Sequence, residues 1–163
     1  MAISVTIGTE RDVEYLASLW MLLVEHHRRL VGDRWPVRPA EQAWDLRQAQ
    51  YRRWLSDRTG LLFVARDGDL ASPVGYAFCL LSGPGPTFDF GETRAEVDSL
   101  VVADTARGAG IGTLLLDACR AELRRRGIRY WSIGVIDANE RAVALYERLG
   151  FRPYVRSLMG TTD

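Results

Sequence analysis

Three glycines at alternate positions, Gly108, Gly110 and Gly112, follow Arg107 in the segment ARGAGIG at residues 106–112. The segment comes after a β-branched run and before a leucine-rich one, which is typical of a turn between a strand and a helix. Glycine lets backbone amides come close to a ligand, and the amides at the start of a helix attract an anion. The segment therefore predicts an anion-binding turn, although turns of this kind also form for packing alone.

Two familiar phosphate-binding motifs do not fit this segment. A P-loop needs a lysine after its last glycine, but the chain contains no lysine, since all 21 of its basic residues are arginines. A dinucleotide-binding fingerprint needs the spacing Gly-x-Gly-x-x-Gly, whereas the spacing here is Gly-x-Gly-x-Gly. Backbone amides alone can hold a pyrophosphate, so this ligand fits the segment, and a turn formed only for packing stays open beside it.

Three side chains in the C-terminal half are candidates for proton transfer. Glu96 and Asp98 lie two residues apart in a predicted strand, so they share a face of the sheet. Tyr146 lies on the apolar stripe of a predicted helix. Each also has a structural interpretation, as a solvated carboxylate or a core tyrosine, and the residue types alone do not decide between the two.

Composition limits the class of protein. The chain of 163 residues has the size of one compact domain, and its 21 basic and 21 acidic residues cancel, so no overall field favours nucleic acid or an anionic membrane. The N-terminus lacks a basic start followed by an apolar core, and no uncharged apolar run approaches about 18 residues, so we expect a cytoplasmic protein. Cys79 and Cys119 lie in apolar patterns and are expected as small buried side chains, and no metal site is predicted.

The elements that must position these residues follow the order β-α-α-β-β-β-α-β-α-β. Strands are predicted over residues 2–8, 60–68, 73–81, 95–102, 129–136 and 151–159, and helices over residues 13–27, 40–55, 112–126 and 140–149, with a turn near residues 67–73. Strands joined by hairpins come first and strands alternating with helices come later. We therefore expect a mixed α/β sheet with helices on its faces, in a single domain over residues 1–163.

Two blocks in the C-terminal half resemble the GCN5-related N-acetyltransferases, the GNAT family. The first block, LVVADTARGAGIGTLLLDACRAEL, carries the family's R/Q-x-x-G-x-G/A phosphate loop at Arg107, Gly110 and Gly112. The second block, IDANERAVALYERLGF, carries the family's spaced residues at Asn139, Ala142, Tyr146, Gly150 and Phe151. The resemblance covers residues 95–154 in detail and the rest in outline, and it implies the GNAT acyl-CoA N-acyltransferase fold, a mostly antiparallel sheet flanked by helices.

The resemblance implies transfer of an acetyl group from acetyl-CoA to a primary amine by direct attack in a ternary complex. It implies that the strand before the loop pairs with the pantetheine arm through Leu100 and Val102, and that Tyr146 faces the sulfur and protonates the thiolate. Glu96 falls where some members carry a glutamate base that acts directly or through water. The residues implied to bind the cofactor are Leu100, Val101, Val102, Arg107, Gly108, Ala109, Gly110, Ile111, Gly112, Thr113, Asn139, Ala142 and Tyr146.

The acceptor side is less defined. In the family, the first two helices and the loop between the third and fourth strands shape the acceptor pocket; here these regions hold His26, His27, Trp35, Tyr76, Phe88, Asp89, Phe90 and Glu92. The acceptor is an amine of a small molecule or of a protein, and the resemblance also implies a homodimer without indicating its interface. A non-catalytic module that binds acyl-CoA for regulation, and a transferase of a longer acyl group, are the alternative functions.

Overall fold

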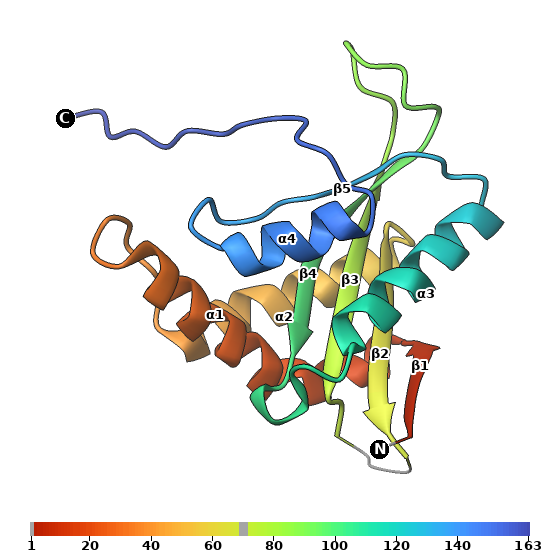
Figure 1. The fold of residues 1–163 in the computed structure, drawn as a ribbon, viewed down its shortest axis with the longest axis horizontal. Helices are drawn as coiled ribbons and strands as arrows, with labels where there is room; N and C mark the ends of the chain where they lie inside the picture. Colours follow the sequence, from red (N-terminus) through yellow and green to blue (C-terminus); the bar gives the residue numbers. More distant parts are fainter. Residues whose placement is uncertain (1, 69–71) are drawn as a thin grey trace.

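The computed structural model describes residues 2–68 and 72–163, which form one five-stranded sheet with helices on both faces (Figure 1). The strands, in the spatial order β1-β2-β3-β4-β5, are β1 (Ile3–Ile7), β2 (Gly60–Asp67), β3 (Gly75–Ser82), β4 (Arg94–Val102) and β5 (Trp131–Ile133). The helices are α1 (Ala17–Val31), α2 (Ala40–Ser56), α3 (Ile111–Arg125) and α4 (Glu140–Arg148), with short 3-10 helices η1 (Glu10–Leu16) and η2 (Asp104–Ala106). Neighbouring strands are antiparallel except β4 and β5, which are parallel. The predicted mixed α/β fold is confirmed.

The sheet separates two hydrophobic cores, because successive side chains of a strand point to opposite faces. In β2, Leu61, Phe63 and Ala65 pack with α3, whereas Leu62 and Val64 pack with α1 and α2. Helix α4 lies on the same face as α3, since its apolar stripe contacts the α3 core. The sheet thus lies between two helix layers, α3 with α4 on one face and α1 with α2 on the other, and each layer has its own hydrophobic core.

A β-bulge interrupts this alternation in β4. Phe78 of β3 pairs with Ser99, but the next residue, Cys79, pairs with Val97, so Asp98 is the extra residue of β4. A bulge of this kind reverses which residues face each side of the sheet.

The reversal is visible in the packing of β4. Before the bulge, Ala95 and Val97 pack with α3; after it, Leu100 packs with α3, while Val101 packs with α1 and α2. Odd-numbered residues therefore face α3 before the bulge, and even-numbered residues face it after the bulge.

Strands β4 and β5 part soon after they pair. Strand β5 ends at Ile133, opposite Val97, whereas β4 continues to Val102. The second half of β4 consequently has no strand beside it on the β5 side among the described residues.

Two predicted strands need correction. The sequence predicts a last strand over residues 151–159, but residues 151–163 form no regular element and run away from the sheet (Figure 1). Pro153 has no amide hydrogen to give to a ladder, and Val155 and Leu158 are exposed, so nothing there supplies a pairing partner or a buried face. The strand predicted at 129–136 is shortened to Trp131–Ile133, and residues 69–71 of the predicted turn lie outside the described residues.

Candidate active site

A cleft of about 920 Å³ lies where β4 and β5 part. Its walls come from α1, from residues 97–102 of β4, from the loop before α3, from residues 133–136 after β5, and from α4. Segments far apart in the sequence therefore meet at one concave site, which is where ligands usually bind.

The glycine turn forms one end of this cleft. Gly108 and Gly110 have φ angles of 82° and 74°, a left-handed conformation that side chains other than glycine's adopt with strain. Gly110 is the N-cap of α3, and no side chain of the described residues caps it. The first amide of this helix to donate inward is that of Leu114, to the carbonyl of Gly110 at 3.0 Å. The amides before it are left for a ligand, which suits an anion.

The other glycine and the arginine of the motif are placed differently. A Cβ at Gly112 would meet only Leu145, at an ordinary contact distance of 3.6 Å, so the fold itself does not require a glycine there. Exposed Arg107 forms an ion pair with Asp104 at 2.8 Å. Both Gly112 and Arg107 line the cleft, as do Ile111 and Thr113, whereas Ala109 does not.

The bulge turns toward the cleft the backbone amides of Leu100 and Val102, the two residues expected to pair with the pantetheine arm. The amide of Ala95 donates to the Tyr130 carbonyl on the β5 side at 3.2 Å, whereas that of Ala103 donates toward β3 at 2.8 Å. Ala95 and Ala103 are an even number of positions apart, so their amides would point to the same side in a regular strand. The extra residue of the bulge explains why they point to opposite sides. Because amides alternate in direction along a strand and that of Ala103 points toward β3, those of Leu100 and Val102 point away from β3, on the side of the cleft.

Tyr146 projects from α4 into the same cleft. Its ring packs edge-on against Phe151 at 6.0 Å, and its hydroxyl makes no hydrogen bond with the described residues. Burial of the side chain raises the pKa of Tyr146 to about 12, so the hydroxyl keeps its proton at neutral pH. It is a hydrogen-bond donor with no protein partner, at the edge of an open site.

Asn139 has a local structural task. Its Oδ1 accepts a hydrogen bond from the amide of Ala142 at 3.2 Å, which caps the N-terminus of α4. Its Nδ2 lies 3.5 Å from Nε2 of His26 on α1, across the cleft. Burial lowers the pKa values of His26 and His27, and Arg107 and His26 respectively lower them further. Both histidines line the cleft, and their lowered pKa values favour the neutral form.

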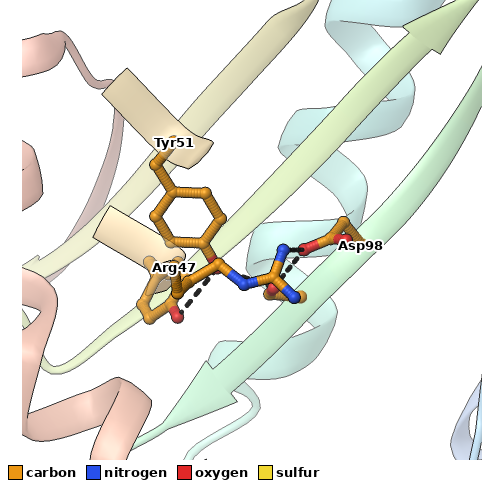
Figure 2. A network of polar contacts seen from close by, with 5 residues as sticks. Arg47, Tyr51 and Asp98 are labelled. Atoms are coloured by element: carbon orange, nitrogen blue, oxygen red, sulfur yellow. Dashed lines mark hydrogen bonds and ion pairs between the residues drawn. The ribbon is translucent and has the colours of Figure 1, made fainter. Parts of the chain in front are cut away.

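The two candidate carboxylates occupy different environments. Asp98 lines the cleft with 17% of its side chain exposed, and its Oδ2 accepts from Nη1 of Arg47 at 2.9 Å and from the hydroxyl of Ser99 at 2.6 Å (Figure 2). Glu96 is exposed and is not among the cleft-lining residues of the described chain. The structure thus brings Asp98, rather than Glu96, into the cleft wall.

The expected acceptor-side residues are not brought together. Only His26 and His27 line the cleft; Tyr76 is fully buried in the core. Phe88 and Phe90 stack on each other at 5.4 Å in the loop between β3 and β4, and both pack on Tyr154 of the C-terminal segment. The remaining candidates outside the cleft lining are Trp35, Asp89 and Glu92.

Sequence reasoning missed three residues near the cleft. Arg47 and Tyr51 come from α2, and Ser99 from β4. Nothing in the spacing of α2 distinguishes Arg47 from the many arginines of a solvated helix face, and the bulge that brings Ser99 to that side has no signature of its own.

Two further properties concern the described part of the chain. None of its helices is both long and apolar enough to cross a membrane. Within residues 2–68 and 72–163, no three His, Cys, Asp or Glu side chains gather as a metal site would require.

Comparison with known proteins establishes the family. The profile of the acetyltransferase (GNAT) family matches residues 20–151, so this chain belongs to that family. It is 36% identical over 140 residues to a mycothiol acetyltransferase of Propionibacterium freudenreichii, covering 86% of this chain and 40% of that protein. It is 38% identical over 117 residues to a mycothiol acetyltransferase of Geodermatophilus obscurus, covering 69% of this chain and 36% of that protein. The chain thus spans about two fifths of the length of these relatives.

Solved structures share the fold at low identity. A GCN5-related N-acetyltransferase from Ralstonia eutropha superposes with a TM-score of 0.79 at 18% identity, covering 99% of this chain and 100% of that one. A predicted acetyltransferase from Clostridium acetobutylicum, crystallised with acetyl-CoA, superposes with a TM-score of 0.76 at 15% identity, covering 98% of this chain and 96% of that one. The predicted GNAT fold is therefore confirmed.

Proposed function

We propose that this protein transfers the acetyl group of acetyl-CoA to a primary amine within one ternary complex. One observation carries the proposal: a single cleft joins the N-terminus of α3, which no side chain of the described residues caps, the half of β4 that has no strand on its β5 side, and Tyr146. An anion, an extended amide-bearing arm and a leaving thiolate each find a matching group along it. Pyrophosphate, pantetheine and thioester follow one another in that order in acetyl-CoA.

Binding uses mainly backbone groups. The pyrophosphate sits against the amides that follow Gly108 and Gly110, where the dipole of α3 favours negative charge. The pantetheine arm pairs with Leu100 and Val102 as an additional strand beside β4. Arg107 adds a positive charge at the phosphate end, once it exchanges its partner Asp104 for the ligand.

The chemical step replaces the carbon–sulfur bond of the thioester by a carbon–nitrogen bond. The amine nitrogen attacks the acetyl carbon, the carbon–sulfur bond breaks, and an amide and the CoA thiolate result, with one proton of the amine released. An amide of β4 polarises the thioester carbonyl, which is usually the largest catalytic contribution in acyl transfer. Tyr146 gives its proton to the thiolate and regains one from the solvent.

In this proposal Glu96 can act as the base only through a water molecule. Its carboxylate lies on the exposed part of β4, outside the cleft wall, so a water molecule would have to carry the proton from the amine to it. The acceptor to screen first is that of the mycothiol acetyltransferases, because these relatives have a named activity and are 36% and 38% identical to this chain.

Calorimetric titration with acetyl-CoA, with free CoA and NADH as comparators, tests the binding site. We expect acetyl-CoA and CoA to bind and NADH not to bind. Gly110→Leu should abolish binding, because a side chain there blocks the amides of α3. Gly127→Leu is the matched control: Gly127 follows the other end of the same helix with a φ angle of 75°, no atom lies within 4 Å of the point that a Cβ would occupy, and the residue lies outside the cleft.

Two results would contradict the proposal. Equal affinity of wild type and Gly110→Leu for acetyl-CoA would mean that the turn has only a packing role. Binding without product from a panel of amines would favour the alternative of a non-catalytic acyl-CoA sensor.

A further inference from the structure

A polar network runs between α2 and β4, from the buried hydroxyls of Tyr51 and Ser99 to the partly buried pair of Arg47 and Asp98 at the cleft wall (Figure 2). The guanidinium of Arg47 stacks over the rings of Trp20 and Tyr51, with its carbon 4.6 and 5.4 Å from their centres, and lies 5.5 Å from the ring of Trp54. Aromatic faces hold an arginine in one orientation and exclude water from it. The contact from this arginine to Asp98 is therefore a fixed one.

The hydroxyl groups of the network point in one direction. Tyr51 donates to Ser99 Oγ at 2.6 Å, and Ser99 donates to Asp98 Oδ2 at 2.6 Å. Because a hydroxyl has one proton, Tyr51 must accept from the hydroxyl of Tyr76, which lies 3.2 Å away. The chain of hydrogen bonds starts at the fully buried Tyr76 and ends on the carboxylate of Asp98.

This arrangement leaves one carboxylate oxygen for a ligand. Oδ2 of Asp98 receives both protein donors, Arg47 and Ser99, whereas Oδ1 accepts no hydrogen bond from the described residues. Asp98 lines the cleft at the bulge, immediately after the last pair between β4 and β5 at Val97 and Ile133. Asp98 thus lies in the cleft wall where the two strands part, and one of its carboxylate oxygens has no hydrogen-bond partner among the described residues.

We propose that Oδ1 of Asp98 binds the nitrogen of the acceptor amine, and that Arg47 and Ser99 position this carboxylate. The inference rests on the proposed acetyl transfer and adds the residue that orients the acceptor. A carboxylate attracts the amine in its protonated form. Once the amine has lost a proton, it still donates an N–H to Oδ1 and keeps its lone pair free for the thioester. The acceptor is accordingly a basic primary amine.

A purely structural role is the competing explanation. The partly buried ion pair between Arg47 and Asp98 would also hold α2 against β4, and its loss would then lower the stability without affecting the acceptor. The two roles differ in which kinetic constant changes, so activity must be separated into binding and turnover.

The test compares Asp98→Asn with wild type in the full chain. The amide of asparagine keeps the shape of the side chain and an oxygen for Arg47, but it carries no charge for the amine. We expect kcat/KM for the amine to fall about 10- to 100-fold, mostly through KM, with the affinity for acetyl-CoA unchanged. The acceptor probes are ethylamine, glucosamine, spermidine and a lysine-ended peptide. Asp117→Asn, on the exposed side of α3, is the matched control.

A second variant tests positioning. Arg47→Lys keeps the positive charge but loses the planar group that stacks on the rings, so we expect a smaller rise in the amine KM than for Arg47→Gln. A structural role alone would lower the melting temperature of both variants without changing the amine KM of the folded protein.

The outcomes separate this inference from the proposed function. Wild type that fails to bind acetyl-CoA, or binds it and acetylates no probe, overturns the proposed function and this inference with it. Wild type that acetylates a probe, with Asp98→Asn unchanged in kcat/KM or less affected than Glu96→Gln, overturns this inference alone.

Discussion

The face of the sheet that packs on α3 has an apolar core that includes two buried cysteines, whereas the face that packs on α1 and α2 buries two tyrosine hydroxyls and a serine and holds a partly buried ion pair. Apolar packing has no preferred direction, but a buried hydrogen bond fixes the orientation of both of its partners. The α3 face serves to hold the helix N-terminus at the cleft. The α1 and α2 face holds polar groups, among them Ser99 and Asp98, at the wall of the cleft.

This division explains how the anion site is supported. Ile111 and Leu115, in the first turns of α3, are 1% and 0% exposed, so packing alone sets the position of the amides at Gly110. No side chain has to reach into the proposed phosphate site to form it. A defect in this core should therefore reduce stability rather than change the chemistry.

Leu115→Ala should give the largest effect on the α3 face. The side chain is fully buried, and its truncation leaves a cavity, so we expect the free energy of unfolding to fall by about 2–5 kcal/mol. Denaturant titration measures it. Leu114→Ala, whose side chain is 43% exposed on the same helix, is the control and should cost much less. Similar losses for the two variants would mean that α3 does not depend on this core.

The α3 face was predictable from the sequence, and the polar network was not. The helical spacing of Ile111, Leu115, Cys119 and Leu123 predicts one buried stripe, and all four are buried. Local periodicity carries that information, because each residue only needs an apolar environment. The glycine turn was predictable for the same reason, since the constraint on Gly108 and Gly110 is local.

The contact between Arg47 and Asp98 joins residues 51 positions apart and depends on a bulge that changes the parity of β4. A strand pattern of period two cannot reveal where an extra residue is inserted. The segment 151–159 shows the reverse case: its composition suits a strand, but a strand also needs a neighbour, and the described fold provides none.

Tyr146→Phe tests the tyrosine hydroxyl that α4 contributes to the cleft. Its ring packs into the apolar core and should keep doing so as phenylalanine, so the stability and the affinity for acetyl-CoA should change little. We expect kcat to fall about 100-fold, because the thiolate loses its proton donor. Steady-state kinetics and calorimetry measure the two quantities separately.

The pH profile adds a check on the same residue. Because burial raises the pKa of Tyr146 to about 12, the donor stays protonated through the neutral and mildly alkaline range. Wild type should therefore show no fall in kcat from its ionisation until the pH approaches that value. A large loss of acetyl-CoA affinity in Tyr146→Phe, with kcat unchanged, would count against the acid role.

Tyr51→Phe gives the smaller effect on the opposite face. The ring keeps its stack on Phe78, at 4.2 Å and 9° between planes, but the hydroxyl that links Tyr76 to Ser99 is lost. The fully buried hydroxyl of Tyr76 is then left without a partner, so the free energy of unfolding should fall by about 1–3 kcal/mol. Thermal and denaturant unfolding measure this loss.

The double variant Tyr51→Phe with Tyr76→Phe decides whether the hydrogen bond or the ring matters. Removing both hydroxyls leaves no unsatisfied group between them, so the double variant should be less destabilised than the sum of the two single ones. Burial also raises the pKa values of Tyr51 and Tyr76, so above about pH 10 their ionisation in the unfolded chain lowers the stability of wild type. The double variant should lose less stability over that alkaline range. Additive losses and an unchanged alkaline slope would mean that this face, like the α3 face, is held by packing alone.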